Sequence, residues 1–117
     1  MKYLFILNDS PYDTELCYNG FRTAHSVTKD NPKAEVTVFL MADAVVCAKA
    51  GQKMPKGYYN VEQMLRRVLS GKGQILLCGT CVDSRGLTDA EMIAGARCST
   101  MEELAATTIG CDKVPVF

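Results

Sequence analysis

The sequence has no surplus of charge of either sign, since 13 lysines and arginines balance 13 aspartates and glutamates. A chain without net charge has no overall field to attract a polyanion or an anionic membrane, so we expect neither nucleic acid nor membrane as a partner. Long apolar runs are also missing. The run at 36–42 is far shorter than the ~20 residues of a membrane span, and the run at 1–7 is too short for a signal sequence. These absences predict a cytoplasmic protein.

Two kinds of ligand site lack their usual residues. A structural zinc site needs about four nitrogen or sulfur ligands, whereas the chain has one histidine, His25, and one Cys-x-x-Cys pair. We therefore expect no metal, and we expect His25 to be an ordinary helix residue. The turn at 8–12, after the first predicted strand, has no glycine. Both the dinucleotide-binding and the P-loop fingerprints need a glycine-rich turn there, so we predict no nucleotide cofactor of either kind.

The length and composition are typical of one globular domain. The 117 residues match the usual size of a domain, and 48% hydrophobic with 22% charged residues is close to the average of soluble chains. We therefore treat residues 1–117 as one domain that folds without disulfides. The six cysteines are predicted to be thiols, and four of them are expected to be small buried hydrophobic residues: Cys17, Cys47, Cys98 and Cys111.

Apolar runs alternate with helical patterns along the chain. We predict strands at 2–7, 35–41, 74–77 and 96–98, and a terminal strand at 113–117 that Pro115 restricts to a sheet edge. Helices are predicted up to residue 30 from a cap at Asp13 or Thr14, and at 44–50, 61–70, 90–94 and 101–108. Strands that are apolar on both faces and alternate with helices indicate an α/β fold, a parallel sheet covered by helices in three layers.

Three local patterns refine this prediction. Asn60 with Gln63, and Thr88 with Glu91, have the spacing of helix N-terminal capping pairs. The segment 51–59 is a long loop rich in glycine, lysine and tyrosine, and loops of this length often carry function. Its Tyr58 and Tyr59 either close over a site or pack against a neighbouring subunit.

Reactive and polar side chains follow the predicted strands. In a parallel α/β sheet, ligands and chemistry collect beyond the carboxyl ends of the strands. There the chain has Asp9, Asp43, the Cys78–Cys81 pair and Ser99. The aspartates are also common in turns and helix caps, where they are structural.

The Cys-x-x-Cys pair is the strongest candidate for chemistry. Its spacing suits disulfide exchange, sulfur transfer through a persulfide, or half of a metal site. A thiolate is the reactive form of cysteine, and cations or backbone amides lower its pKa. We therefore expect Arg85 and the turn amides of 78–86 to stabilise a Cys78 thiolate, with Asp43 orienting the site.

Three segments together resemble the DsrE/DsrF-like family, and most closely its YchN-like branch. They are Phe-Leu-Met-Ala-Asp-Ala-Val at 39–45, the glycine and tyrosine loop with Gln-Met-Leu at 51–65, and Leu-Cys-Gly-Thr-Cys-Val-Asp-Ser-Arg-Gly at 77–86. The likeness extends over nearly the whole chain. The Cys-x-x-Cys-x-Asp-x-Arg-Gly block is its most specific part.

The resemblance implies an α/β/α domain with a mainly parallel five-stranded sheet, assembled as a homotrimer or homohexamer. Sulfur-relay members of the family accept sulfane sulfur as a persulfide on a cysteine that matches Cys78, and they exchange it with donor and acceptor proteins. Cys81 belongs to the YchN-like pattern and not to the relay members. A second thiol at this spacing could resolve a Cys78 persulfide by forming a disulfide, or the pair could serve redox chemistry.

Three functions follow as hypotheses. The first is a sulfur-handling protein in which Cys78 accepts sulfane sulfur and Cys81 assists its release. The second is an oligomeric binding or scaffold protein whose loop at 52–59 holds a small ligand, the thiols being incidental. The third is a disulfide oxidoreductase, which the reduction potential of the Cys78 and Cys81 pair would distinguish from a persulfide carrier.

Overall fold

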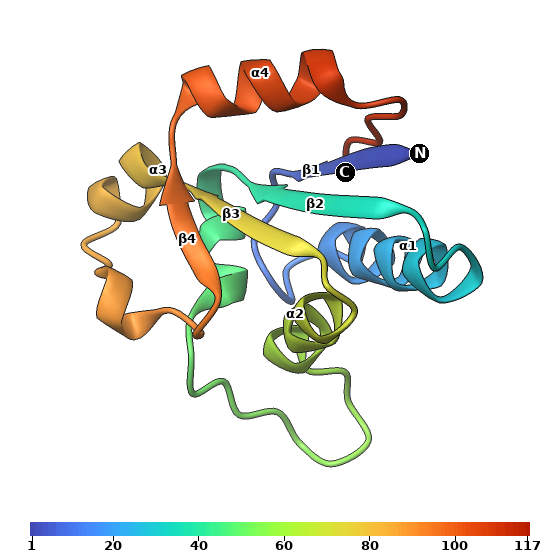
Figure 1. The fold of residues 1–117 in the computed structure, drawn as a ribbon. Coiled ribbons are helices and arrows are strands. Elements are labelled where there is room, and N and C mark those ends of the chain that lie inside the picture. The colour runs from blue at the N-terminus through green and yellow to red at the C-terminus, as the bar shows by residue number, and fades with distance from the viewer.

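The alternating order of strands and helices is the one that the sequence predicts, in a computed structural model that describes all residues 1–117. Four strands form one parallel sheet: β1 (Lys2–Leu7), β2 (Glu35–Leu40), β3 (Gln74–Cys78) and β4 (Ala96–Ser99). Their order in the sheet is β1-β2-β3-β4, so each strand lies beside the next one in the chain (Figure 1). The predicted α/β fold with a parallel sheet is confirmed.

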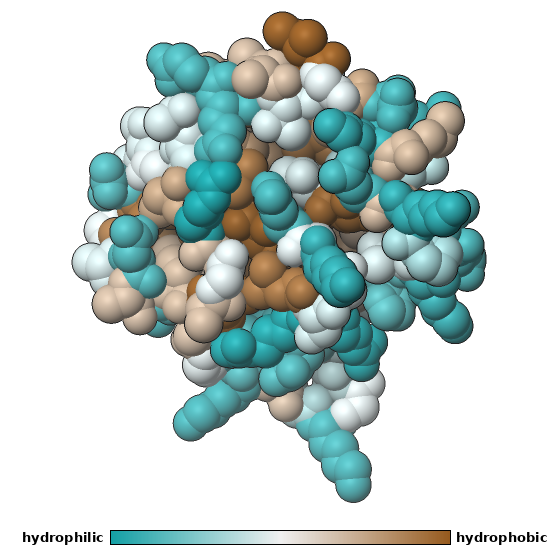
Figure 2. Space-filling model, in the orientation of Figure 1, coloured by the Kyte–Doolittle hydropathy of each residue, from teal (hydrophilic) through white to brown (hydrophobic).

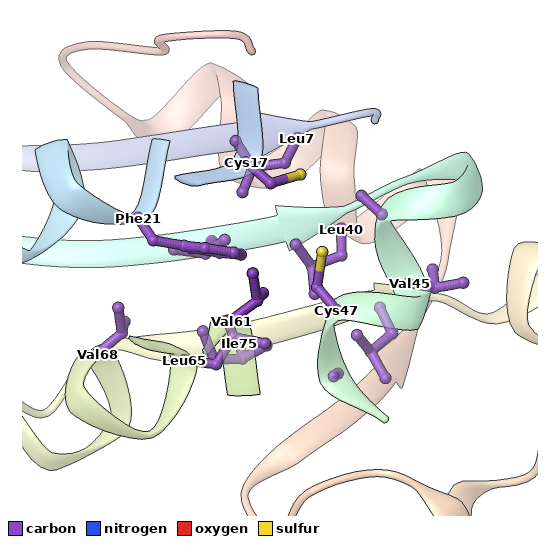
Figure 3. Packing of buried hydrophobic residues seen from close by; sticks show 14 of the residues in the cluster. Leu7, Cys17, Phe21, Leu40, Val45, Cys47, Val61, Leu65, Val68 and Ile75 are labelled. Carbon is purple, nitrogen blue, oxygen red and sulfur yellow. The ribbon is translucent and has the colours of Figure 1, made fainter. Parts of the chain in front are cut away.

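The helices form the two outer layers. α1 (Leu16–Asp30), α2 (Val61–Ser70) and the 3-10 helix η1 (Ala42–Ala48) lie on one face of the sheet, and α4 (Met101–Gly110) lies alone on the other (Figure 1). The hydrophobic core is divided accordingly. Twenty buried residues pack between the sheet and α1, α2 and η1 (Figure 3), whereas only Leu4, Phe39, Leu76 and Leu104 form the buried cluster under α4. The α4 face of the sheet is therefore thinly covered.

The fifth strand expected from the resemblance is reduced to a bridged segment. Tyr3 pairs with Lys113, and Ile6 with Val116, as isolated parallel bridges beside β1. The backbone amide of Ile6 donates to the Pro115 carbonyl at 3.0 Å. Proline has no amide to donate, so a regular ladder cannot continue through residue 115. The segment lies at the sheet edge beyond β1, as the sequence predicts, but the sheet has four strands.

Two predicted helices are shorter or tighter than expected. The stretch predicted as a helix at 44–50 is the 3-10 helix η1, and the one predicted at 90–94 is a single 3-10 turn, η2 (Asp89–Glu91). The Thr88 and Glu91 capping box is present. The helix does not continue beyond η2 because the next backbone groups pair with another segment. The Ile93 amide donates to the Ala48 carbonyl at 2.9 Å, next to an antiparallel bridge between Lys49 and Met92.

Side-chain acceptors also lie at the starts of α1, α2 and α4. The Asn60 side chain accepts from the Gln63 amide at 3.1 Å, and Thr100 accepts from the Glu103 amide at 3.2 Å. At the first helix, the Thr14 hydroxyl accepts from the Leu16 amide, with Glu15 at the cap position.

No helix combines the length and the apolar character that crossing a membrane requires.

Candidate functional site

The site lies where the carboxyl ends of β2 and β3 meet. These strands are paired in parallel, Leu40 opposite Leu77, so the residues that follow them are neighbours. Ala42 and Asp43 begin η1 after β2, and Cys78 ends β3. A six-residue helix, α3 (Gly79–Ser84), follows Cys78 at once, where the sequence predicts only a polar turn. The predicted convergence of Asp43 and Cys78 at one edge of the sheet is thus present.

Cys78 is the N-cap of α3. Its sulfur accepts a hydrogen bond from the Cys81 backbone amide at 3.3 Å, which is the role that an Asp or Ser oxygen usually has at this position. The side chain is half-buried between the two hydrophobic clusters. Burial raises the pKa of the Cys78 thiol, and hydrogen bonding with the Cys81 thiol raises it further, while the amides of Cys81 and Thr80 lower it. Two amides are therefore in place to stabilise a thiolate once it forms.

The Cys81 thiol is held by the segment that follows β2. The Ala42 amide donates to the Cys81 sulfur at 3.2 Å. Ala42 has a φ of 49°, in the left-handed region that costs a residue with a side chain about 1–2 kcal/mol. This conformation turns the chain away from the β2 ladder at the point where the Ala42 amide reaches α3.

The Arg85 side chain bonds to oxygens from both segments that flank the thiols. Its guanidinium contacts the Asp43 carboxylate through Nε at 2.8 Å and Nη2 at 2.7 Å, and its Nη1 donates to the Cys81 carbonyl at 3.1 Å. The guanidinium bonds to these oxygens and makes no hydrogen bond to the Cys78 sulfur. Asp43 and Arg85 instead tie the start of η1 to the end of α3.

Sequence reasoning missed a third thiol next to the pair. Cys98, on β4, pairs in register with Leu77, one residue before Cys78. Its thiol donates to the Asp89 carboxylate at 3.0 Å, and this hydrogen bond is the main reason why its pKa is raised to about 11. The strand order was the missing information, because only a known order brings residues 98 and 78 together. Gly79 is also explained by this neighbouring strand, since a Cβ there would lie 3.2 Å from the Ser99 carbonyl oxygen.

The remaining candidates lie elsewhere. Asp9 accepts from the Thr14 hydroxyl, and its carbonyl accepts from the Cys17 thiol at 3.0 Å, beneath α1. His25 is exposed on α1. Tyr59 packs on tyrosines of its own chain, and Tyr58 is 68% exposed.

The four cysteines predicted to be buried divide into two kinds. Cys17 and Cys47 are buried in the main core (Figure 3), whereas Cys98 and Cys111 are only half-buried, which corrects the expectation for those two. The hydrogen bond between the buried thiols lowers the pKa of Cys17 and raises that of Cys47. This pair belongs to the core beneath α1 and not to the Cys78 site.

Comparison with known proteins supplies the classification. The model of the DsrE/DsrF-like family matches residues 1–117. This chain belongs to the DsrE/DsrF-like family. It is 35% identical to protein YchN of Escherichia coli over 116 residues, which are 99% of this chain and 98% of YchN. An uncharacterized protein of Methanocaldococcus jannaschii is 31% identical over all 117 residues and its own full length.

The structural comparisons agree with the sequence comparisons. The crystal structure of E. coli YchN superposes with a TM-score of 0.95 at 35% identity, covering 100% of this chain and 99% of YchN. A protein of unknown function from Methanobacterium thermoautotrophicum has a TM-score of 0.77 at 10% identity, covering 97% of this chain and 98% of that protein, which shows a shared fold. The resemblance to the DsrE/DsrF-like family and its YchN-like branch is confirmed.

In this DsrE/DsrF-like chain, the arrangement can support two thiol reactions. The Cys78 sulfur is partly accessible, accepts from the Cys81 amide, and has the second thiol of the pair one helical turn away in α3. A thiolate so placed can attack a sulfur electrophile, and the neighbouring thiol can then attack the product. No group of three or more His, Cys, Asp and Glu side chains is arranged to hold a metal ion.

Proposed function

We propose that this protein accepts sulfane sulfur as a persulfide on Cys78 and releases it with the help of Cys81. The observation that carries the proposal is the geometry of Cys78 itself, a half-buried thiol at the end of β3 that caps α3 and accepts the Cys81 amide at 3.3 Å. Membership of the DsrE/DsrF-like family supports a link to sulfur relay. Both reactions below follow from thiol chemistry at this geometry.

The loading step is an exchange between a donor persulfide and the Cys78 thiolate. The thiolate attacks the outer sulfur of R–S–SH, a sulfur–sulfur bond forms at Cys78, the donor's sulfur–sulfur bond breaks, and R–S⁻ leaves. Sulfane sulfur passes from one thiol to another, so the step needs no external oxidant. The Cys81 and Thr80 amides favour the thiolate form, opposing the burial that raises the pKa of Cys78.

The release step uses the second thiol. The Cys81 thiolate attacks the Cys78 sulfur of Cys78–S–SH, forms a Cys78–Cys81 disulfide and expels HS⁻. The sulfane sulfur is reduced to sulfide, and the two thiols supply the two electrons. A dithiol reductant must then restore the thiols. An acceptor protein that takes the outer sulfur directly would leave Cys78 as a thiol and would not need Cys81.

Mass spectrometry of the intact protein tests the proposal. The reduced protein is exposed to a persulfide-generating donor, beside the variants Cys78→Ser, Cys81→Ser and, as a control, Cys111→Ser. Cys111 is also a half-buried free thiol, but it packs against the small cluster under α4. We expect a gain of one sulfur, about 32 Da, in the wild type and in Cys111→Ser, no gain in Cys78→Ser, and an equal or longer-lived gain in Cys81→Ser.

Two outcomes would contradict the proposal. Full loading of Cys78→Ser would show that another thiol is the acceptor. Absence of retained sulfur in both the wild type and Cys81→Ser would remove sulfur carriage itself.

A disulfide oxidoreductase is the second candidate function. The observation that favours it is that the Cys78 sulfur accepts from the Cys81 amide at 3.3 Å, which places both cysteines in the first turn of α3, the arrangement from which a Cys-x-x-Cys pair closes a disulfide. Titration of the pair against a glutathione or dithiothreitol redox buffer separates the two functions. A reversible two-electron potential near the cytosolic poise would favour the oxidoreductase, since persulfide carriage needs no such disulfide.

The setting of the proposed reaction follows from the same chemistry. We place the protein in the cytoplasm, where thiols stay reduced, with sulfur donor and acceptor proteins as partners. We also propose self-association as a homotrimer or homohexamer. The apolar residues that α4 exposes, among them Met101 and Ile109, support an assembly through that face.

A further inference from the structure

A groove of about 500 Å³ lies on the helical side of the molecule, formed by α1, α2 and the end of the loop before α2. Small-molecule sites usually have volumes of about 300–1,000 Å³, so a small ligand would fit. Its walls include three tyrosines and two arginines: Tyr18, Tyr58, Tyr59, Arg22 and Arg67. None of these residues belongs to the elements that hold Cys78, Cys81 and Asp43.

The aromatic wall is a rigid stack. The rings of Tyr18 and Tyr59 are stacked with centroids 4.3 Å apart, and the centroid of Tyr12 lies 5.6 Å from that of Tyr59. Tyr12 is fixed in turn, because its hydroxyl donates to Gln52 Oε1 at 2.6 Å and accepts from the Val61 amide at 2.9 Å. A stack held in this way costs a ligand little side-chain ordering.

The same groove carries positive charge that no carboxylate neutralises. The three ion pairs of the chain use Arg66, Arg85 and Arg97, so the guanidinium groups of Arg22 and Arg67 are left without one. Arg22 donates only to the Asn19 side-chain oxygen at 3.2 Å and lies 5.0 Å from the centre of the Tyr18 ring. No Asp or Glu lines the groove. Glu15 is not part of the lining, but its negative charge reaches the groove. Burial raises the pKa of Tyr59, and the Glu15 carboxylate raises it further.

We infer that this groove binds a planar aromatic anion, with a nucleoside monophosphate as the class of ligand that fits it. A base can stack on the exposed ring of Tyr58 beside the Tyr18 and Tyr59 stack, and a phosphate can pair with the two guanidinium groups. Tyrosine rings alone, or unpaired guanidinium groups alone, would not indicate such a ligand. Because both lie in one groove, they match a molecule that has both a ring and an anionic group. The site uses no glycine-rich loop, so it differs from the nucleotide sites that the sequence excludes.

Isothermal titration calorimetry of the full chain tests this inference with AMP, adenosine and inorganic phosphate as separate probes. We expect AMP to bind at least tenfold more tightly than adenosine or phosphate, and its affinity to fall as salt is raised, because salt screens exposed charges. The double variant Arg22→Gln with Arg67→Gln, and the variant Tyr58→Leu, should each weaken AMP binding at least tenfold. Retained circular dichroism spectra will show that they are folded.

The control removes the same charge outside the groove, through Lys29→Gln with Lys72→Gln, and should leave AMP affinity within twofold. Equal binding of AMP to the control and to the arginine variant would overturn the inference. So would an absence of AMP binding, or binding of a short oligoadenylate without AMP, which would indicate a nucleic-acid surface instead. Sulfur loading on Cys78 is a separate readout, so neither result depends on the proposed function.

Discussion

Among the thiols near the site, each pKa follows from the group that the sulfur contacts. The Cys78 sulfur meets backbone amides, which favour its thiolate, although burial outweighs them. The Cys98 thiol meets a carboxylate, which holds the proton on sulfur. Two cysteines on neighbouring strands therefore have different chemistry, because one faces donors and the other faces an acceptor.

Replacing Asp89 with asparagine should make Cys98 reactive. With a pKa of about 11, few Cys98 thiols are ionised at pH 8, and loss of the carboxylate moves the pKa back toward the ordinary value of 9.0. A complete return to 9.0 would raise the thiolate fraction, and with it the alkylation rate, by up to about 100-fold. The rate of iodoacetamide modification at Cys98, followed by peptide mass spectrometry, measures this. Asp83→Asn is the matched control and should change the rate less, because Asp83 acts only through its charge. Equal rates in Asp89→Asn and wild type would contradict this account.

Replacing Asp43 with asparagine should slow sulfur loading on Cys78 while changing the stability of the protein little. The ion pair with Arg85 is solvent-exposed, with the Asp43 side chain 63% accessible, so its loss should lower the free energy of unfolding by less than about 1 kcal/mol. Arg85 would lose its anchor while it holds the Cys81 carbonyl, so sulfur loading on Cys78 should slow several-fold. Urea unfolding and loading kinetics give the two numbers. Asp13→Asn, an exposed carboxylate in the turn before α1, should change neither, and unchanged loading in Asp43→Asn would exclude a positioning role.

At the scale of elements, sequence patterns predicted regular structure well and irregular structure poorly. The apolar runs identified all four strands, because buried parallel strands need uninterrupted hydrophobic residues. The helix α3 was missed because its cap is a thiol, Cys78, and its first residue is a glycine, neither of which signals a helix start. The helix at 90–94 was overestimated because a local capping pattern cannot reveal that Ile93 donates to Ala48, 45 residues earlier.

The candidate site was predictable to the same extent. Position after a buried strand was enough to select Cys78, Cys81 and Asp43, since parallel strands gather their carboxyl ends at one edge. The partner of Arg85 was not predictable, because it depends on which neighbouring loop brings a carboxylate closest. Cys98 needed the strand order, which no single sequence contains.

The attachment of α4 should depend on pH through Glu103. This carboxylate pairs with both terminal nitrogens of Arg97 on β4, at 2.9 and 2.6 Å, and these contacts are the main reason why its pKa falls to about 2 from the ordinary 4.5. A depressed folded pKa gives stability that is present above pH 4.5 and is lost as the pH falls toward 2. The advantage of the wild type over Glu103→Gln in thermal midpoint should therefore be constant above about pH 4.5 and shrink below it. A Glu102→Gln variant, beside it on α4, should show no such change, and a pH-independent advantage would contradict the assignment.

At the scale of the whole molecule, the two faces of the sheet are unequal. The face under α1, α2 and η1 holds most of the core, whereas α4 contributes one buried side chain, Leu104. Figure 2 shows strongly hydrophobic atoms at the top of the molecule, over α4, and in the middle of the face shown. A monomer would leave apolar side chains of α4 and part of this sheet face exposed to water. In the proposed assembly, a second copy of the chain buries this surface.

The α4 face should therefore determine the oligomeric state. Light scattering after size exclusion is expected to give three or six times the chain mass of 12.8 kDa. Ile109, 87% exposed, and Met101, 61% exposed, would lie in the contact, so Ile109→Lys with Met101→Lys should shift the protein to monomers, because a buried unpaired charge is costly. Leu16→Lys places the same charge on an exposed apolar residue of α1 and should leave the assembly intact. A monomeric wild type would remove the proposed assembly, and dissociation by Leu16→Lys alone would move the interface from α4 to the side of the molecule that carries the tyrosine and arginine groove.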